Sequence, residues 1–257
     1  MSIVLRLRGE NGCPWDRAQT PKTMRPYVIE EAYEVVDAID REDDADLRKE
    51  LGDVLFQIVL LSTMAEERAV FTLEDVVRGI SEKMVSRHPH VFGEAAADPE
   101  ARAAAVGIGA WEARKARERS AEASVLDGVP RALPALLRAH KVSDKAAGVG
   151  FDWPDRAGVR AKVTEELAEL DEAIVSGDAE AIGEELGDLL FSLVNLGRHL
   201  PVGAEDALRQ ATLKFETRFR AVEASLRDDG VSIHDADLAT LEAHWAQAKS
   251  HLSKEKP

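Results

Sequence analysis

The strongest constraint on the fold is an acidic pattern that occurs twice in the chain. Two segments, residues 30–34 (Glu-Glu-x-x-Glu) and 50–53 (Glu-x-x-Asp), reappear 135 positions later at 165–169 and 185–188. The spacing between the two segments is the same in both copies, which indicates a duplicated module. Further residues match in the same order: Leu55, Phe56, Lys83, Arg87, Trp111 and Lys115 with Leu190, Phe191, Lys214, Arg218, Trp245 and Lys249.

The periodicity of the second copy predicts two helices joined by a short turn. Apolar residues recur at steps of three and four over 163–174 and again over 182–193, which is one face of a helix in each case. Gly177 is a helix stop and Asp178 a helix N-cap. So short a connection predicts an antiparallel pair whose apolar faces are buried. With few aromatic residues and abundant Ala, Leu, Glu and Arg, we expect an all-α fold of two tandem helical-bundle modules.

The charge of the chain argues against general nucleic-acid binding. It contains 33 Lys and Arg residues and 48 Asp and Glu residues, which gives a formal net charge of -15. Such a surface repels a phosphate backbone, so an anionic substrate needs a local cationic or metal-filled pocket. Because Cys13 is the one cysteine, an intrachain disulfide is excluded. With no apolar run of membrane-spanning length and no secretory signal, the sequence predicts a cytoplasmic protein without membrane contact.

The acidic residues of each copy fall on matching helix edges. At about 100° per residue, Glu166 and Glu169 border one edge of the first apolar face, and Glu185 and Asp188 border the same edge of the second. Antiparallel packing would bring four carboxylates together at the margin of the core. Their mutual repulsion calls for a cation, and oxygen donors favour Mg²⁺, with Mn²⁺ as a substitute.

The acidic pattern has two other possible explanations, a solvated helix face and a di-iron site. A lone Glu-x-x-Glu is usually the solvated face of an amphipathic helix, but a doubled motif followed twice at fixed distance by Glu-x-x-Asp is not explained that way. A di-iron bundle uses Glu-x-x-His pairs, and the sequence contains none. A hard divalent cation is therefore the favoured occupant.

Cations and an aromatic residue downstream are candidate substrate ligands. Lys214 and Arg218 lie four residues apart, on one helix face, where both can bind phosphate oxygens. Their counterparts are Lys83 and Arg87. For Trp245, burial in the core and stacking on a nucleobase are equally compatible with the sequence.

Together with the acidic motifs, three more segments resemble the MazG family of nucleoside triphosphate pyrophosphohydrolases: residues 11–16 (Asn-Gly-Cys-Pro-Trp-Asp), 87–92 (Arg-His-Pro-His-Val-Phe) and 150–153 (Gly-Phe-Asp-Trp). The similarity spans nearly the whole chain. It implies Mg²⁺-dependent cleavage of nucleoside triphosphates between the α and β phosphates, with broad base tolerance. It also implies a homodimer whose neighbouring modules complete each other's pockets, a role in nucleotide-pool housekeeping or stress response, and a possible stress-response protein partner.

The resemblance also assigns residues to roles. Metal ligands would be Glu166, Glu169, Glu185 and Asp188 in the second module, and Glu31, Glu34, Glu50 and Asp53 in the first. The catalytic set would be Glu166, Glu169, Glu185, Asp188, Lys214 and Arg218. Nucleotide and phosphate binding would involve Lys162, Glu165, Glu166, Glu184, Glu185, Asp188, Lys214, Arg218 and Trp245.

The two modules differ at the position of Lys162. Tyr27 stands where the second module has Lys162, and a tyrosine offers no positive charge to a triphosphate. We therefore expect a first module at 1–120, a linker at 121–129, and a second module at 130–257 as the main catalytic module. Which carboxylate acts as general base, and how many ions bind, stay open.

Two alternative functions remain at this stage. The chain could be a nucleotide-sensing interaction protein with little turnover, or a narrow dUTPase-like enzyme. A single open aromatic platform tolerates many bases, whereas a hydrogen-bonding pocket would favour one.

Overall fold

The computed structural model describes residues 2–93, 124–200 and 202–254, and all its regular elements in these ranges are helices. The chain divides into two compact units, Met1–Arg114 and Lys115–Pro257. The all-α expectation is confirmed for the described residues. The module limits predicted around 121–129 fall partly outside those residues and stay a prediction.

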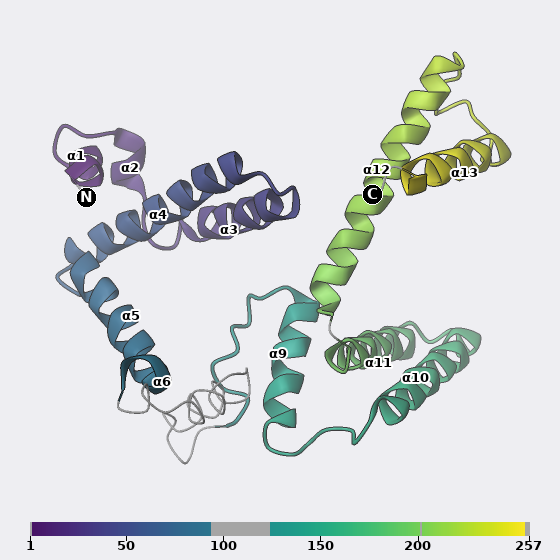
Figure 1. The fold of residues 1–257 in the computed structure, drawn as a ribbon, viewed down its shortest axis with the longest axis horizontal. Helices are drawn as coiled ribbons and strands as arrows, with labels where there is room; N and C mark the ends of the chain where they lie inside the picture. Colours follow the sequence, from purple (N-terminus) through teal and green to yellow (C-terminus); the bar gives the residue numbers. More distant parts are fainter. Residues whose placement is uncertain (1, 94–123, 201, 255–257) are drawn as a thin grey trace. The chain divides into compact units, whose positions relative to one another are not determined.

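The first unit is built around an antiparallel helix pair. Helices α3 and α4 lie side by side, the short α1 packs against α4, and α2 packs against α1 (Figure 1). Val4, Met24, Leu60 and Met64 form its buried apolar core. The helices of this unit are α1 (Ser2–Arg8), α2 (Pro14–Ala18), α3 (Arg25–Asp40), α4 (Asp44–Glu66), α5 (Leu73–Arg87) and α6 (Pro89–Phe92).

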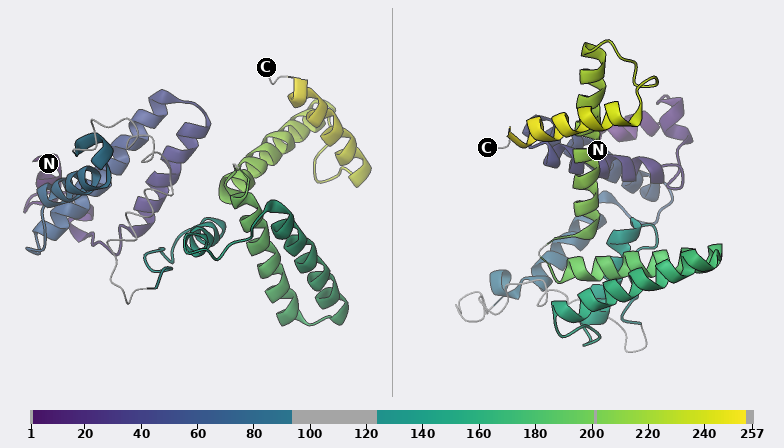
Figure 2. Two further views of the ribbon diagram at one scale, coloured as in Figure 1. Left: turned by 60° about the horizontal axis from the view of Figure 1, so that its bottom comes forward. Right: turned by 90° about the vertical axis from the view of Figure 1, so that its right-hand side faces the viewer.

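The second unit repeats the helix pair and adds a second hairpin. Helices α10 and α11 pack along their lengths, α9 covers the C-terminal half of α11, and α12 runs away from the pair (Figures 1 and 2). Val222, Leu226 and Ala248 join α12 to α13. The helices are α9 (Ala135–Ala147), α10 (Arg156–Ser176), α11 (Ala179–Arg198), α12 (Ala204–Asp228) and α13 (Leu238–Lys254).

The turn between α10 and α11 has the predicted chemistry. Gly177 adopts a left-handed conformation with φ of 73°, which ends α10. The Asp178 side chain accepts hydrogen bonds from the backbone N–H groups of Glu180 and Ala181 and so caps α11. Asp43 caps α4 in the same way. The two turns therefore fix both helix pairs as antiparallel hairpins.

The prediction that the apolar faces are buried is wrong for much of the second pair. Leu167 and Ile174 on α10, and Leu186, Leu190 and Leu193 on α11, leave about half of each side chain exposed. Instead, α10 buries Val159, Glu166 and Ala173. The physical reason is that a two-helix hairpin covers only one side of each helix, so the rest of the apolar surface is left partly uncovered by the described residues.

A charged network fastens the loop before α10 to the end of α11. Asp152 accepts hydrogen bonds from Arg198 Nη2 and, at 3.2 Å, from His199 Nε2 when that nitrogen carries a proton. The hydrogen bond from Arg198 holds the pKa of the Asp152 carboxyl below its ordinary value. This network fixes the loop that leads into α10.

We predict that Asp152→Asn lowers the free energy of unfolding by about 1 kcal/mol at neutral pH, because a charge-assisted hydrogen bond in a partly exposed site is lost. The folded-state pKa lies below the ordinary value of 3.8. The stabilisation is therefore complete above that value and is lost as the pH falls through the folded-state pKa. Urea denaturation, followed by circular dichroism, measures the free energy of unfolding at each pH. The values for the wild type and for Asp152→Asn should converge at acidic pH.

Asp171→Asn, on the exposed side of α10, is the control and should match the wild type at every pH. A stability difference for Asp152→Asn that does not change with pH would contradict the ionic origin of the effect.

Candidate metal and nucleotide site

Three acidic side chains from α10 and α11 converge in the second unit. Glu166, Glu185 and Asp188 each offer a carboxylate oxygen, and these oxygens lie within 4.8 Å of one another. Glu166 is 5% exposed, while Glu185 is half-buried and Asp188 is exposed. We call these three residues the C-terminal acid cluster. One buried and two accessible carboxylates form a site that is fixed on one side and open on the other.

Lys162 neutralises part of the C-terminal acid cluster. Its Nζ lies 2.7 Å from Glu166 Oε1 and 2.8 Å from Glu165 Oε1. The hydrogen bonds with Glu165 and Glu166 raise the pKa of the lysine well above its ordinary value, so it is charged. Because Lys162 is one turn before Glu166 on α10, the sequence spacing alone determines this contact.

Glu169 lies beside the cluster without being one of its three converging groups. Desolvation raises the pKa of Glu169, Lys162 opposes the rise, and the negative charges of Glu166, Glu165 and Glu185 add to it. Glu169 therefore experiences the same excess of negative charge.

An equivalent cluster occurs in the first unit. Glu31 on α3 and Glu50 and Asp53 on α4 also bring carboxylate oxygens within 4.8 Å of one another. We call these residues the N-terminal acid cluster. Glu34 lies next to it: desolvation raises its pKa first, and the charges of Glu50, Glu31 and Glu30 raise it further. The repeat in sequence is thus a repeat in geometry.

The cation at the N-terminal acid cluster comes from a position that the sequence reasoning missed. Lys49 Nζ lies 2.6 Å from Glu50 Oε1. Tyr27, which replaces the lysine of the other module, packs instead against the apolar core and, edge to face, against Trp15. Superposing the repeats by sequence could have found the exchange, because Lys49 corresponds to Glu184.

The donor set fits a hard divalent cation. All converging groups are carboxylate oxygens, the ligands of Mg²⁺, Mn²⁺ and Ca²⁺ rather than of softer metals. Glu50 Oε2 is buried without a hydrogen-bond partner among the described residues. Because a buried anionic oxygen is costly to leave unpaired, a bound cation explains its position. The identity of the metal does not follow from these residues.

The other predicted ligands of the second unit do not join the C-terminal acid cluster within one chain. Lys214 is exposed and Arg218 half-buried in the middle of α12, which leads away from α10 and α11 (Figure 1). Neither has a hydrogen-bond or ion-pair partner within the described part of the chain. Trp245 is half-buried on α13 and packs at 5.2 Å, between ring centroids, against Phe215. Glu184 is exposed on the first turns of α11.

The corresponding residues of the first unit are only partly described. Lys83 is exposed on α5, and Arg87 at its end is buried. Trp111 and Lys115 lie outside the described residues. The described part of the first unit therefore shows the acids but does not show its nucleobase side.

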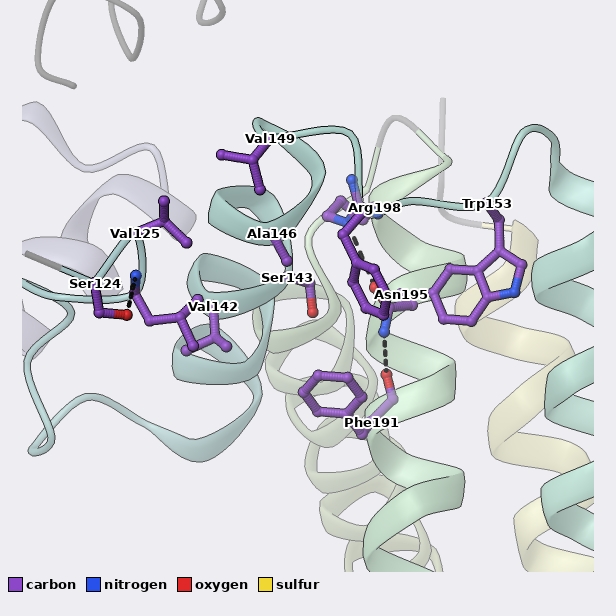
Figure 3. A pocket seen from close by; sticks show the side chains of 12 residues that line it. Ser124, Val125, Val142, Ser143, Ala146, Val149, Trp153, Phe191, Asn195 and Arg198 are labelled. Carbon is purple, nitrogen blue, oxygen red and sulfur yellow. Dashed lines mark hydrogen bonds between the residues drawn. The ribbon is translucent and has the colours of Figure 1, made fainter. Parts of the chain in front are cut away.

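A cavity of about 450 Å³ lies between α9 and the C-terminal half of α11. Figure 3 shows Phe191 and Asn195 of α11 facing Val142 and Ser143 of α9, with Trp153 at one side. Sequence reasoning did not find this cavity. Its lining is mostly apolar and includes none of the acid-cluster residues, so it is separate from the proposed metal ligands.

In the described residues, no helix is long and apolar enough to cross a membrane.

Comparison with known proteins places these clusters in a family. The MazG nucleotide pyrophosphohydrolase domain matches residues 19–92 and 156–222, which contain both acid clusters. The chain is 47% identical over 256 residues to a nucleoside triphosphate pyrophosphohydrolase of Escherichia coli, covering 97% of this chain and 95% of that protein. It is 43% identical over 250 residues to the nucleoside triphosphate pyrophosphohydrolase/pyrophosphatase MazG of Thermotoga maritima, covering 97% and 94%.

A more distant relative is a nucleoside triphosphate pyrophosphohydrolase of Mycolicibacterium smegmatis, 31% identical over 261 residues, which cover 95% of this chain and 68% of that protein. The resemblance inferred from the motifs is thereby confirmed. On the domain match and the near full-length identity, this chain belongs to the MazG nucleotide pyrophosphohydrolase family.

Proposed function

We propose that the chain hydrolyses nucleoside triphosphates to the monophosphate and pyrophosphate with Mg²⁺ or Mn²⁺. The observation that carries the proposal is the convergence of Glu166, Glu185 and Asp188 in a chain with 47% identity to a pyrophosphohydrolase. A cluster of accessible carboxylates attracts a divalent ion, and Mg²⁺ seldom fills its shell with protein atoms alone. The open positions suit water and phosphate oxygens despite the negative net charge.

Each residue of the second unit has a defined task in this proposal. Glu166, Glu185 and Asp188 hold the ion between α10 and α11, and Glu169 adds a fourth carboxylate from the next turn of α10. When bound, the divalent ion polarises the phosphoryl group and lowers the pKa of the attacking water. Buried Glu166 fixes the position of the ion, because its side chain has little freedom to move.

Lys162 binds the triphosphate. In the structure its ammonium group neutralises Glu166, and the side chain is one third exposed. With an ion bound at Glu166, this carboxylate would no longer need the lysine for neutralisation, and the long Lys162 side chain would be free to bind phosphate oxygens. Its charge then offsets the negative charge that develops on the leaving pyrophosphate.

Lys214, Arg218 and Trp245 reach the nucleotide from a second copy of the chain. Two observations support this part of the proposal. Lys214, Arg218 and Trp245 have no contact with the C-terminal acid cluster in the described part of the chain, and five apolar residues of α10 and α11 are about half exposed there. An exposed apolar face of this kind marks a protein interface. A homodimer would cover it and complete the site.

We predict that Glu185→Gln and Asp188→Asn each weaken Mn²⁺ binding and lower turnover of ATP by about tenfold to a hundredfold, because each removes one charged oxygen ligand. Isothermal titration and pyrophosphate release measure the two quantities. Glu180→Gln, on the exposed first turn of the same helix, is the matched control and should behave as the wild type. Unchanged Mg²⁺-dependent turnover in both cluster variants would reject the assignment.

We predict that ATP, GTP and the corresponding deoxynucleotides all give the monophosphate and pyrophosphate in the presence of Mg²⁺, because contacts with the phosphates and an aromatic platform do not select one base. Chromatography of the products measures both the bond broken and the base preference. Nucleotide binding without stoichiometric product would favour a sensor, and activity confined to dUTP would favour a dUTPase-like enzyme. Release of the diphosphate and phosphate would contradict cleavage at the α–β bond.

We predict that the wild-type chain has twice the chain mass in solution and that Leu190→Glu converts it to a monomer, because a charge would be buried in the apolar interface. Light scattering after size-exclusion chromatography gives the mass. Val175→Glu, at the exposed end of α10, is the control and should leave the mass unchanged. A Leu190→Glu variant with the mass and turnover of the wild type would exclude this face as the interface.

A further inference from the structure

Gln57 distinguishes the N-terminal acid cluster from its C-terminal counterpart. It lies on α4 four residues after Asp53 and seven after Glu50, so all three side chains lie on one face of the helix. At the matching position of α11 the second module has Ser192, which has no amide group. Both residues are 5% exposed, so the exchange changes the chemistry of a buried site.

Of the two polar atoms in the Gln57 amide, the nitrogen has a hydrogen-bond partner among the described residues and the oxygen has none. Its Nε2 donates to Glu31 Oε1 at 3.3 Å, which brings the amide to the edge of the N-terminal acid cluster. Its Oε1 is buried and has no hydrogen-bond partner among the described residues. Glu50 Oε2 is buried and without such a partner as well. Two unpaired buried oxygens, two turns apart on one face of α4, are costly unless a cation completes them.

The charges around Gln57 favour such a cation. Glu31, Glu50 and Asp53 bring three carboxylates together, and Lys49 is the cation that pairs with one of them. The cluster therefore keeps an excess of negative charge. An amide oxygen is also a regular ligand of hard divalent ions.

We propose that the N-terminal acid cluster binds a divalent cation with the amide oxygen of Gln57 as a ligand in addition to Glu31, Glu50 and Asp53. This inference rests on the metal binding proposed above for the acid clusters. The N-terminal centre then has one more donor from the chain than the C-terminal centre. It holds its ion more tightly in the absence of nucleotide and leaves one position fewer for a phosphate oxygen.

The test is a titration of the full chain with Mn²⁺, followed by electron paramagnetic resonance of the free ion. Glu185→Gln combined with Asp188→Asn disables the C-terminal acid cluster and isolates the N-terminal centre. We expect this double variant to bind one Mn²⁺ per chain. Adding Gln57→Ser, the residue of the other module, should weaken the remaining binding by about tenfold or more.

Gln57→Glu in the same background separates a ligand from a structural role. It keeps an oxygen for the ion but loses the N–H group that donates to Glu31, so binding should stay close to that of the double variant or tighten. Equal weakening by Gln57→Ser and Gln57→Glu would overturn the proposal, because Gln57 would then act only through Glu31. An unchanged affinity in Gln57→Ser would overturn it too. Circular dichroism establishes that each variant keeps its helices.

A second double variant, which disables the N-terminal acid cluster instead, separates a failure of the Gln57 inference from a failure of the proposed function. Glu31→Gln combined with Glu50→Gln leaves the C-terminal acid cluster intact. If this chain binds Mn²⁺ and the first background does not, the inference about Gln57 fails alone. If neither background binds Mn²⁺, the proposed metal chemistry of both modules fails.

Discussion

The architecture depends on bringing like charges together between two antiparallel helices. Glu166, Glu185 and Asp188 converge within a few ångströms, with one of them buried. Coulomb repulsion and desolvation both oppose this arrangement, and only a positive charge can offset them. In the structure Lys162 provides it, and in the proposed active state a divalent ion does. The helix pair thus makes an acidic protein able to receive an anionic substrate.

The two modules solve the same electrostatic problem with lysines from different helices. In the second module Lys162 comes from α10, one turn before the buried glutamate, and can reach outward to a phosphate. In the first module Lys49 comes from α4 and is adjacent to Glu50. Tyr27 replaces the lysine there and Gln57 lies beside the acids, which is why we propose that the N-terminal acid cluster holds its ion more tightly. The duplication therefore produced two related sites with different donor sets.

The repeat and the turn signals could be predicted because they depend on local chemistry. Gly177 and Asp178 fix the hairpin, and the spacing of the acids fixes which edge of each helix they occupy. The exposure of Leu167 and Leu186 could not be predicted, because burial depends on which elements pack against a helix face, and the described residues leave both side chains about half exposed. Gln57 was missed because it belongs to no motif, and its place beside the N-terminal acid cluster becomes visible only in the contact with Glu31 and in the burial of its unpaired oxygen.

The most direct test of the central claim is a crystal structure of the chain with Mn²⁺ and a non-hydrolysable nucleoside triphosphate analogue, using anomalous scattering to locate the metal. The account predicts an anomalous peak between α10 and α11, at coordination distance from oxygens of Glu166, Glu185 and Asp188, with the triphosphate bound to it. Carboxylates turned apart into solvent, with the metal or the nucleotide bound elsewhere, would contradict it.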